Sequence, residues 1–273
     1  MPKQPRKTPN AARPISPPSP RILVAIPVYN EVNYAPHVIE KVRRFHDQIL
    51  FIDDGSTDGT AELLDGRAAR GEIQLHRHPT NRGYGQSIID AFCYAKRHGY
   101  DWVITMDCDE QHEPEVIPKF VELIREDRWD IISGTRYLEA RQDNDLPPGD
   151  RRAINATITS TLNELFDWNL TDAFCGFKAH RVSAMIPLRL DETGYAFPLQ
   201  LWPRVAKAGL RVRELPVRLI YNDPTRHFGG GLDDAGVRLR HYLDVLDREV
   251  KRDALMETVA GDDCAVVPCC CHG

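Results

Sequence analysis

Acidic and polar side chains follow three apolar runs that are predicted to be β-strands. The runs lead into residues 27–31 (PVYNE), 53–60 (DDGSTDGT) and 107–112 (DCDEQH). Because ligands of open parallel α/β sheets bind beyond the carboxyl ends of the strands, we expect these segments to meet at one edge of a sheet. Carboxylates that converge in this way repel each other, so the pattern predicts a cation or strong hydrogen-bond donors among them.

The 107–112 segment has the composition of a divalent metal site. Asp107 and Asp109 stand two residues apart at a strand end, where a turn brings both carboxylates to one centre, and Gln111 adds a further oxygen. Hard oxygen ligands that leave room for water and phosphate suit Mg²⁺ or Mn²⁺ better than Zn²⁺. The alternative is a loop whose acidic residues cap the next helix, a role that also suits Glu113 or Glu115.

The 53–60 segment has both a structural and a binding interpretation. Asp-Gly and Ser-Thr-Asp-Gly are typical of turns and helix caps, so one of the two aspartates is expected to order the loop. We assign the other, Asp54, to a nucleotide base or a ribose hydroxyl. Residues 81–86 (NRGYGQ) form a glycine-containing turn into a helix, where backbone N–H groups would meet ligand oxygens. This turn is no Walker loop, because no Gly-Lys-Ser/Thr follows.

Short β-rich runs that alternate with helical patterns must position these segments. The expected strands are residues 23–28, 49–52, 73–76, 102–106, 131–134 and 217–221. Apolar spacing predicts helices around residues 38–45, 88–95, 117–124, 154–165 and 239–250. The charged residues and prolines of residues 138–149 predict a flexible loop. This βαβ rhythm predicts a mostly parallel sheet of the α/β class, with helices on both faces.

Composition excludes several classes of protein. The chain has 273 residues, of which 42% are hydrophobic and 27% charged, enough to fold as one large domain or two small ones. A net charge of -5 argues against a nucleic-acid-binding protein driven by counterion release. The longest clean apolar run, residues 22–26, is too short to cross a bilayer, so we expect no transmembrane segment.

The two ends of the chain differ from the rest. Residues 1–20 contain seven prolines, four Lys or Arg and no acidic residue, which predicts a disordered basic arm. Four of the seven cysteines lie in the last ten residues without the second half of a zinc site, so residues 259–273 are expected to form a disordered tail. An odd number of cysteines without framework spacing favours a reducing, cytoplasmic location.

The three acidic segments, in this order and spacing, resemble the motifs of family 2 inverting glycosyltransferases with the GT-A fold. The branch that the chain resembles most is that of the dolichyl-phosphate and polyprenyl-phosphate mannosyl- and glucosyltransferases. The similarity continues through residues 134–137 (GTRY), 172–178 (DAFCGFK) and Arg226. It implies one GT-A catalytic domain over residues 21–232, which an amphipathic helix over residues 233–258 follows.

The resemblance also implies roles for individual residues. Those implied to bind the nucleotide sugar are Pro27, Tyr29, Glu31, Asp54, Gly85, Asp107 and Cys108. Those implied to bind Mg²⁺ or Mn²⁺ on the donor diphosphate are Asp107, Asp109 and Gln111. The cations implied to contact donor and acceptor phosphates are Arg136, Arg152, Lys178 and Arg226, since guanidinium groups suit phosphate. The catalytic set is Asp107, Asp109, Arg136, Lys178 and Arg226.

Four positions depart from the family pattern, all toward the acceptor side or the pocket between donor and acceptor. Ala156 stands where a second arginine is usual, Gln200 where glutamate is common, and Cys175 where serine is usual; residues 228–232 lack an expected lysine. Gln200 cannot act as a base, which favours a phosphate acceptor, whereas the missing arginine at Ala156 argues against one. The resemblance therefore defines the donor side better than the acceptor side.

The expected function is transfer of a hexose, with inversion, from a GDP-mannose- or UDP-glucose-type donor to an acceptor, with a polyprenyl phosphate as one candidate. One alternative is a catalytically inactive partner subunit that binds nucleotide sugars, and another is a nucleotidyltransferase of similar architecture. The latter lacks the glycine- and lysine-rich sequence expected after the first strand. Peripheral contact with the inner membrane face fits a lipid acceptor, but the mixed charges of the terminal helix favour its packing on the protein.

Overall fold

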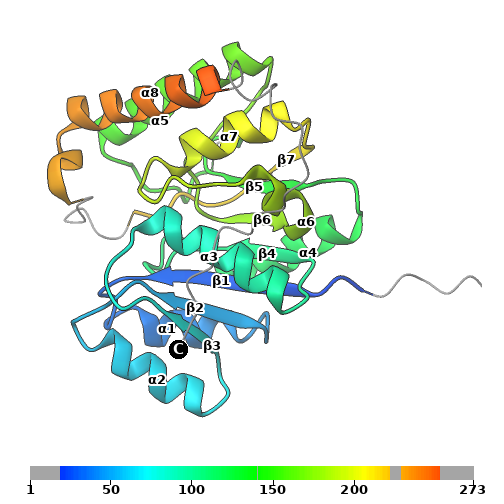
Figure 1. Ribbon diagram of the computed structural model, residues 1–273, viewed down its shortest axis with the longest axis vertical. Coiled ribbons are helices and arrows are strands. Elements are labelled where there is room, and N and C mark those ends of the chain that lie inside the picture. The colour runs from blue at the N-terminus through cyan, green and yellow to red at the C-terminus, as the bar shows by residue number, and fades with distance from the viewer. Residues whose placement is uncertain (1–18, 140, 222–228, 253–273) are drawn as a thin grey trace, which may run out of the picture.

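The computed structural model describes residues 19–139, 141–221 and 229–252 (Figure 1). The arm predicted at residues 1–20 lies outside the described residues except for positions 19 and 20. Arg226, residues 253–258 of the predicted terminal helix and the tail predicted at 259–273 also lie outside them.

A seven-stranded sheet in the order β3-β2-β1-β4-β6-β5-β7 forms the centre of the molecule. The strands are β1 Ile22–Val28, β2 Ile49–Asp53, β3 Gln74–Arg77, β4 Trp102–Thr105, β5 Ile131–Thr135, β6 Lys178–Arg181 and β7 Val212–Pro216. Only β6 runs antiparallel to its neighbours among the described strand pairs. The predicted mostly parallel sheet is therefore confirmed.

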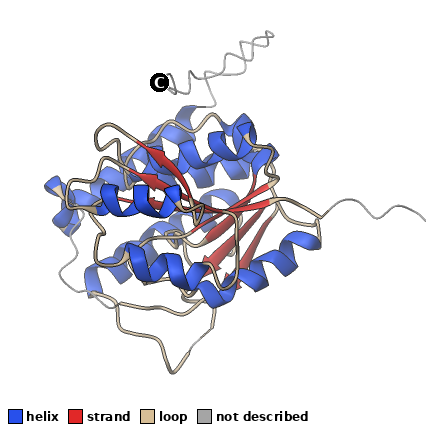
Figure 2. Cartoon of the chain, turned by 90° about the horizontal axis from the view of Figure 1, so that it is seen from below, coloured by secondary structure: helices blue, strands red, loops and turns tan. Residues whose placement is uncertain are grey.

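Helices cover both faces of this sheet, as predicted (Figures 1 and 2). They are α1 Ala35–Val42, α2 Thr60–Ala69, α3 Tyr84–Arg97, α4 Ile117–Arg125, α5 Gly149–Phe166, α6 Val182–Met185, α7 Phe197–Lys207 and α8 Ala235–Lys251, with short 3-10 turns η1 Pro114–Val116, η2 Ile186–Leu188 and η3 Gly230–Asp233. Alternate residues of β1 pack on opposite faces: Leu23 joins the core beneath α3, and Val24 the core beneath α1 and α4. This two-sided burial explains the continuous apolar run of β1.

The predicted strand at 217–221 is wrong. The edge strand lies five residues earlier, at Val212–Pro216, where it pairs with β5. Its exposed or half-buried residues include charged ones, so its sequence lacks the apolar signal of a central strand. The Val217 N–H still donates to the Thr135 carbonyl of β5. Beyond it the chain bonds to a loop, since the Leu219 and Tyr221 N–H groups donate to the Asn144 and Asp145 side chains.

Strand β6 has no counterpart among the predicted strands. Its four residues, Lys178-Ala-His-Arg181, carry three basic side chains, although Lys178 and His180 are buried. Buried lysine and histidine are uncommon in strands, so the hydrophobic pattern does not show β6.

Details of the helices also differ from the prediction. Leu165 and Leu243 are 48% and 37% exposed instead of facing the core. Helices α2 and α7 were not predicted; α7 contains Pro203 in its interior, which is unusual for a helix. Helix α8 packs its buried side chains against α7 and α5.

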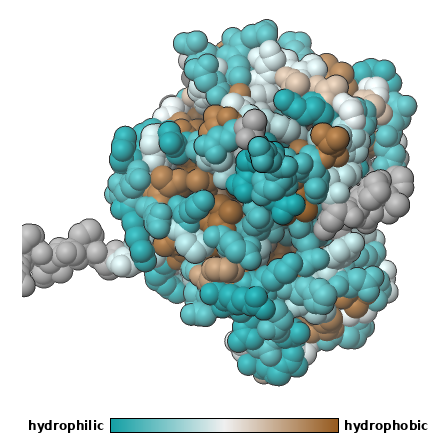
Figure 3. Space-filling model, turned by 180° about the vertical axis from the view of Figure 1, so that it is seen from behind, coloured by the Kyte–Doolittle hydropathy of each residue, from teal (hydrophilic) through white to brown (hydrophobic). Residues whose placement is uncertain are grey.

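The described helices include none with the length and apolar character of a bilayer-spanning segment. The face opposite to the view of Figure 1 shows hydrophilic side chains interspersed with smaller hydrophobic areas (Figure 3).

Candidate active site

A cavity of about 360 Å³ opens where β1, β2, β4 and β5 end and β6 begins. It brings together ten of the predicted site residues: Pro27, Tyr29, Glu31, Asp54, Asp107, Cys108, Asp109, Gln111, Arg136 and Lys178. A concave site at the carboxyl edge of a sheet is where ligands of α/β proteins bind.

Hydrogen bonds between two loops hold the residues that follow β1. The Asn30 N–H donates to Ser56 Oγ and the Glu31 N–H to Thr60 Oγ1, both at 2.9 Å. In return, the Thr57 N–H donates to Asn30 Oδ1 at 2.8 Å. The serine- and threonine-rich segment after β2 therefore orders the loop that carries the cavity residue Glu31.

Both members of the Asp53–Asp54 pair are buried and hydrogen-bonded within the chain. Asp53 accepts from Arg77 Nε at 2.9 Å. Asp54 lines the cavity, and its carboxylate accepts from the Arg82 and Gly83 N–H groups at 2.7 and 2.9 Å. Asp53 also accepts from the Ser56 N–H at 2.9 Å, so it orders its own loop, as predicted of one of the two aspartates. Asp54 instead orders the turn before α3, through partners more than twenty residues away that leave no local signal.

His78, which follows β3, bridges two buried carboxylates. Its Nδ1 lies 2.6 Å from Asp54 Oδ1 and its Nε2 lies 2.9 Å from Asp90 Oδ2. Burial by itself lowers the pKa of His78, but the hydrogen bonds to Asp54 and Asp90 raise it to about 9. His78 is therefore a cation at neutral pH. Metal-ligand atoms of His76, His78 and Asp90 lie within 4.8 Å of one another, but both His78 nitrogens already pair with carboxylates.

Gly85, which was predicted to bind the nucleotide, does not line the cavity. A Cβ atom at this position would overlap the Glu192 carbonyl oxygen. The next residue, Gln86, donates its N–H to the Thr193 carbonyl at 3.1 Å. Gly85 is required because α3 packs directly against the 192–194 backbone, a tertiary contact that the turn sequence does not show.

The segment after β4 is ordered by its own side chains. Asp109 Oδ1 accepts from the Gln111 N–H at 3.0 Å, and the Asp107 N–H donates to His112 Nδ1 at the same distance. His112 stacks on Phe177 with 5.1 Å between ring centroids, and burial lowers its pKa to about 4. His112 is therefore neutral near pH 7, and it holds the Asp107 backbone from outside the cavity lining, a role that the sequence analysis did not assign to it.

Two other residues pack against the Asp107 carboxylate. Burial raises the pKa of the Tyr84 hydroxyl, and the charge of Asp107, to which it is hydrogen-bonded, raises it further. A Cβ atom at Gly176 would lie 2.6 Å from Asp107 Oδ2, so only glycine leaves this carboxylate its space. The oxygens of Asp107, Asp109 and Gln111 form a donor set that fits Mg²⁺ or Mn²⁺.

Arg136 faces the cavity from the end of β5 and is held by a buried carboxylate. Its Nε and Nη2 atoms donate to Asp172 at 2.6 and 2.9 Å, and Asn155 Nδ2 donates to the same carboxylate at 2.8 Å. Burial favours the neutral form of Asp172, but the charge of Arg136 holds its pKa at about 2. The pair therefore stays ionised, and it fixes the guanidinium at the cavity wall.

Lys178 lies beside Arg136 at the start of β6 and is 5% exposed. Its ammonium donates to the Cys175 carbonyl and lies 5.5 Å from the centroid of the Trp202 ring. Burial lowers the pKa of Lys178. Burial also raises the pKa of the Cys175 thiol, which lines the cavity as a neutral group at the position where serine is usual.

Arg152 of α5, which was predicted to contact phosphate, lies outside the cavity lining. It is exposed, although its guanidinium lies 3.9 Å from the ring centroid of the cavity residue Tyr137. Arg151 and Arg238 line the cavity instead. Arg238 is 3% exposed and donates to Asp150 at 2.5 Å. The turn of α5 decides which of two adjacent arginines faces inward.

Gln200 is buried outside the cavity, so its identity says nothing about a base next to the acceptor. Its Oε1 accepts from the Asp191 and Glu192 N–H groups at 2.7 and 2.8 Å. Its Nε2 donates to Glu249 of α8 at 2.9 Å. Ala156 is exposed and also lies outside the cavity lining. These two departures from the family pattern therefore lie outside the cavity in which we placed them.

The sequence has similarity to a known family over most of this region. Residues 23–188 match the sequence model of Glycosyl transferase family 2. The chain is 28% identical over 230 residues to undecaprenyl-phosphate mannosyltransferase of Micrococcus luteus. That alignment covers 81% of this chain and 93% of the relative. The chain is also 30% identical over 207 residues to polyprenol monophosphomannose synthase of Mycolicibacterium smegmatis. This second alignment covers 73% of this chain and 77% of the relative.

Solved structures share the fold. Glucosyl-3-phosphoglycerate synthase from Mycobacterium tuberculosis superimposes with a TM-score of 0.59 at 18% identity, over 85% of this chain and 81% of that one. A complex of that synthase with Mn²⁺, UDP-glucose and phosphoglyceric acid gives the same TM-score and identity, over 85% of this chain and 80% of that one.

Proposed function

Since the chain belongs to glycosyl transferase family 2 and has the GT-A fold, we propose that it transfers a hexose from a nucleoside diphosphate sugar to a polyprenyl phosphate, with Mg²⁺ or Mn²⁺. The observation that carries this proposal is the division of charge in one cavity. The acidic residues that line it are Glu31, Asp54, Asp107 and Asp109, and the basic ones, apart from His180, are Arg136, Arg151, Lys178 and Arg238.

The nucleoside would lie over the ends of β1 and β2. Pro27, Tyr29 and Glu31 line the cavity there, and Tyr29 is 45% exposed, which leaves its ring surface accessible to a base. The loop–loop hydrogen bonds hold this wall in place before a ligand arrives. A site that is ordered in advance loses less conformational entropy on binding.

The donor diphosphate would lie over the end of β4. Asp107, Asp109 and Gln111 would hold the divalent ion, which when bound would act as a Lewis acid toward the departing diphosphate. Arg136 and Lys178 supply fixed positive charge on the other side. Because both cations are held by hydrogen bonds, they need little reorganisation as negative charge develops on the leaving group.

The acceptor would approach from the side of α5 and α8. Among the described residues that line this part of the cavity there are two arginines, Arg151 and Arg238, but no carboxylate. A hydroxyl acceptor needs a general base near the anomeric carbon, whereas an ionised phosphate attacks without one. Arg238 is paired with Asp150, so Arg151 is the residue of this wall that supports a phosphate acceptor, in agreement with the relatives named for undecaprenyl phosphate and polyprenol.

The reaction that follows is an in-line displacement. An acceptor phosphate oxygen forms a bond to the anomeric carbon while the bond to the nucleoside diphosphate breaks, with inversion. Such an acceptor resides in a membrane, so we expect the cavity to meet it at a bilayer surface on the cytoplasmic side.

An activity assay with the purified 273-residue protein tests the proposal. The protein would be incubated with GDP-mannose or UDP-glucose, with Mg²⁺ or Mn²⁺, and with undecaprenyl phosphate or its non-phosphorylated alcohol. We expect metal-dependent release of the nucleoside diphosphate and a glycosylated lipid from the phosphate alone. Tight donor binding without turnover on a wide acceptor panel would favour the inactive subunit. Release of pyrophosphate from a nucleoside triphosphate would favour a nucleotidyltransferase.

A further inference from the structure

Glu214 of the edge strand β7 bonds to a peptide that is distant in the chain. Its Oε1 accepts from the Thr171 and Asp172 N–H groups at 2.9 and 3.2 Å, and its Oε2 accepts from Thr171 Oγ1 at 3.0 Å. Glu214 does not line the cavity. Any effect of Glu214 on a bound substrate must therefore pass through the residues that it contacts.

The position of Glu214 is unfavourable for a carboxylate apart from these hydrogen bonds. Burial raises the pKa of Glu214, and the charge of Asp172 raises it further, whereas the hydrogen bonds from Thr171 and Asp172 lower it. A carboxylate that loses hydration beside a second carboxylate gains stability only from the donors around it. This balance indicates that Glu214 contributes its bonds to the 171–172 peptide.

The 171–172 peptide in turn holds Arg136. Besides the two bonds from the Arg136 guanidinium, the Asp172 carboxylate accepts from the Arg136 backbone N–H at 3.2 Å. Thr171 Oγ1 lies 2.6 Å from Oγ1 of Thr135, the residue that precedes Arg136. Through two adjacent residues, Glu214 is therefore connected to both the side chain and the backbone of Arg136.

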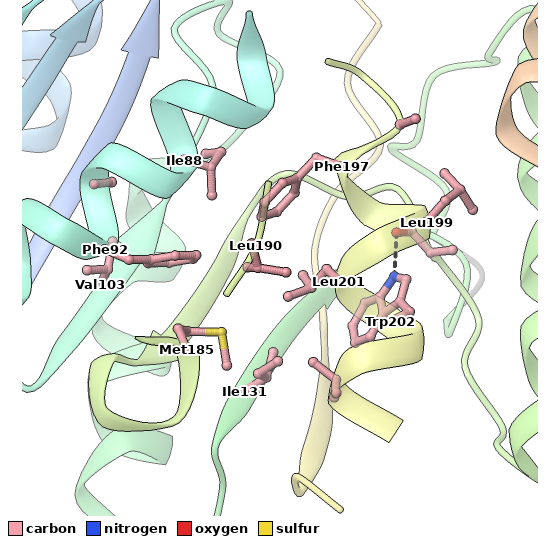
Figure 4. Packing of buried hydrophobic residues seen from close by; sticks show 14 of the residues in the cluster. Ile88, Phe92, Val103, Ile131, Met185, Leu190, Phe197, Leu199, Leu201 and Trp202 are labelled. Carbon is pink, nitrogen blue, oxygen red and sulfur yellow. Dashed lines mark hydrogen bonds between the residues drawn. The ribbon is translucent and has the colours of Figure 1, made fainter. Parts of the chain in front are cut away.

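The residues on either side of this peptide have other partners. The Leu170 N–H donates to Asn163 Oδ1 of α5 at 2.9 Å. Trp202 of α7 donates its indole N–H to the Ala173 carbonyl at 2.8 Å, which is the dashed line in Figure 4. Loss of Glu214 should therefore let the 171–172 peptide shift between two fixed flanks without unfolding the chain.

We propose that Glu214 is a positioning residue for glycosyl transfer, which fixes the 171–172 peptide and thereby the direction in which the Arg136 guanidinium faces the cavity. This inference rests on the proposed function, in which Arg136 acts on the departing diphosphate. A preorganised charge acts most strongly on the charge that develops in the transition state. Glu214 should therefore affect kcat more than the KM of the donor.

Three substitutions at position 214 distinguish positioning from general packing. Glu214→Ala removes both acceptor oxygens. Glu214→Gln keeps one oxygen for the two N–H groups, and its amide can donate to Thr171 Oγ1, which then donates to Thr135. Glu214→Asp keeps the charge on a side chain that is too short to reach all three donors. Arg213→Ala, at an exposed position of the same strand, is the matched control.

Steady-state kinetics with the nucleotide sugar, Mn²⁺ and undecaprenyl phosphate give the first readout. We expect Glu214→Ala to lower kcat about 10-fold to 100-fold while the donor KM stays within about threefold of wild type. Glu214→Gln should restore kcat to within about threefold of wild type, because it satisfies the same three groups. Arg213→Ala should behave as wild type.

A double-mutant cycle with Arg136→Lys tests the route of the effect. This substitution keeps a positive charge beside Asp172 but removes the planar fork of the guanidinium. If Glu214 acts through Arg136, Glu214→Ala should lower kcat by less than about threefold in the Arg136→Lys background.

Equal fold losses of kcat in the two backgrounds would overturn the inference, as would a failure of Glu214→Gln to restore kcat. If Glu214→Ala does not fold, Glu214→Asp takes its place under the same criteria, and unfolding of both would show a structural role alone and overturn the inference. These outcomes leave the proposed function in place. Absence of turnover by the wild type with every donor would overturn the proposed function together with the inference.

Discussion

The two sides of the cavity are built in different ways. The side over β1, β2 and β4, which we call the donor side, consists of loops that directly follow parallel strands and cross-link to each other. The side over β5, β6, α5 and α8, the acceptor side, consists of residues from distant segments. They are held by ion pairs in which one partner is buried, such as Arg136–Asp172 and Arg238–Asp150. Substitutions on the donor side should therefore leave the free energy of unfolding nearly unchanged. Substitutions on the acceptor side should lower it.

The largest expected effect comes from the donor side. Asp109→Asn should lower metal-dependent turnover by about 10³-fold, because the amide carries no charge for the divalent ion. The Gln111 N–H can still donate to the remaining carbonyl oxygen, so the melting temperature should stay within a few degrees of wild type. Asp244→Asn, at an exposed position of α8, is the matched control and should be fully active. Full turnover by Asp109→Asn would refute the assignment of the donor side.

A variant of the acceptor side should lose stability as well as activity. Asp172→Asn leaves the Arg136 guanidinium at the cavity wall without its buried counter-charge, which should cost about 3 kcal/mol of unfolding free energy in urea titrations. Asp143→Asn removes the partner of Arg141 in an exposed pair and should cost less than about 1 kcal/mol. Equal losses in the two variants would contradict the distinction between the two sides.

His78 departs from this distinction between the two sides, because it forms buried ion pairs with Asp54 and Asp90 on the donor side. His78→Gln should weaken nucleoside diphosphate binding about 10-fold, since Asp54, which accepts from the 82–83 turn, loses its charged partner.

The same residue predicts a pH dependence of stability. The pKa of His78 rises from the model-peptide value of about 6.5 to about 9 on folding, so the folded state binds the proton more tightly. Its stabilising contribution is full below pH 6.5 and is lost as the pH rises through 9. Thermal melts between pH 6 and 10 should show this decline in wild type and a smaller one in His78→Gln. Parallel curves would rule out the proton on His78 as the cause.

The smallest effects distinguish two adjacent arginines of α5. Arg151→Ala should lower turnover with undecaprenyl phosphate about 10-fold, because Arg151 lines the acceptor side of the cavity. Arg152→Ala should change turnover by less than about threefold, because Arg152 is exposed and contacts only the outer ring surface of Tyr137 among the contacts described. Kinetics in which Arg152→Ala is the more damaging variant would reverse this placement.

Much of the donor side could be predicted because its information is local. An apolar run followed by a carboxylate fixes both a strand and the edge at which its next residue lies, and parallel pairing brings several such ends together. Asp107 and Asp109 could be identified as candidate metal ligands from the sequence around them, without their spatial neighbours. Gly85 and Asp54 were only partly understood, because the contacts that define them come from residues 192–194 and from His78.

The acceptor side depends on contacts that local patterns do not contain. Arg151 and Arg152 are equivalent in sequence, and only the packing of α5 turns one of them inward. Gln200 occupies a position associated with catalysis, yet its amide holds Glu249 and the 191–192 backbone.

The amino-acid sequence alone determined the α/β class and the order of the acidic loops, and it carries the prediction of a divalent ion among their oxygens. Hydrophobic periodicity and strand-end chemistry act over a few residues, and that is enough for those conclusions. Tertiary structure alone decided the antiparallel insertion of β6, the burial of His78 between two carboxylates and the bonds of Glu214 to the 171–172 peptide. Each of these results from contacts between segments that are distant in the chain, where burial and hydrogen bonding outweigh the preferences of the local sequence.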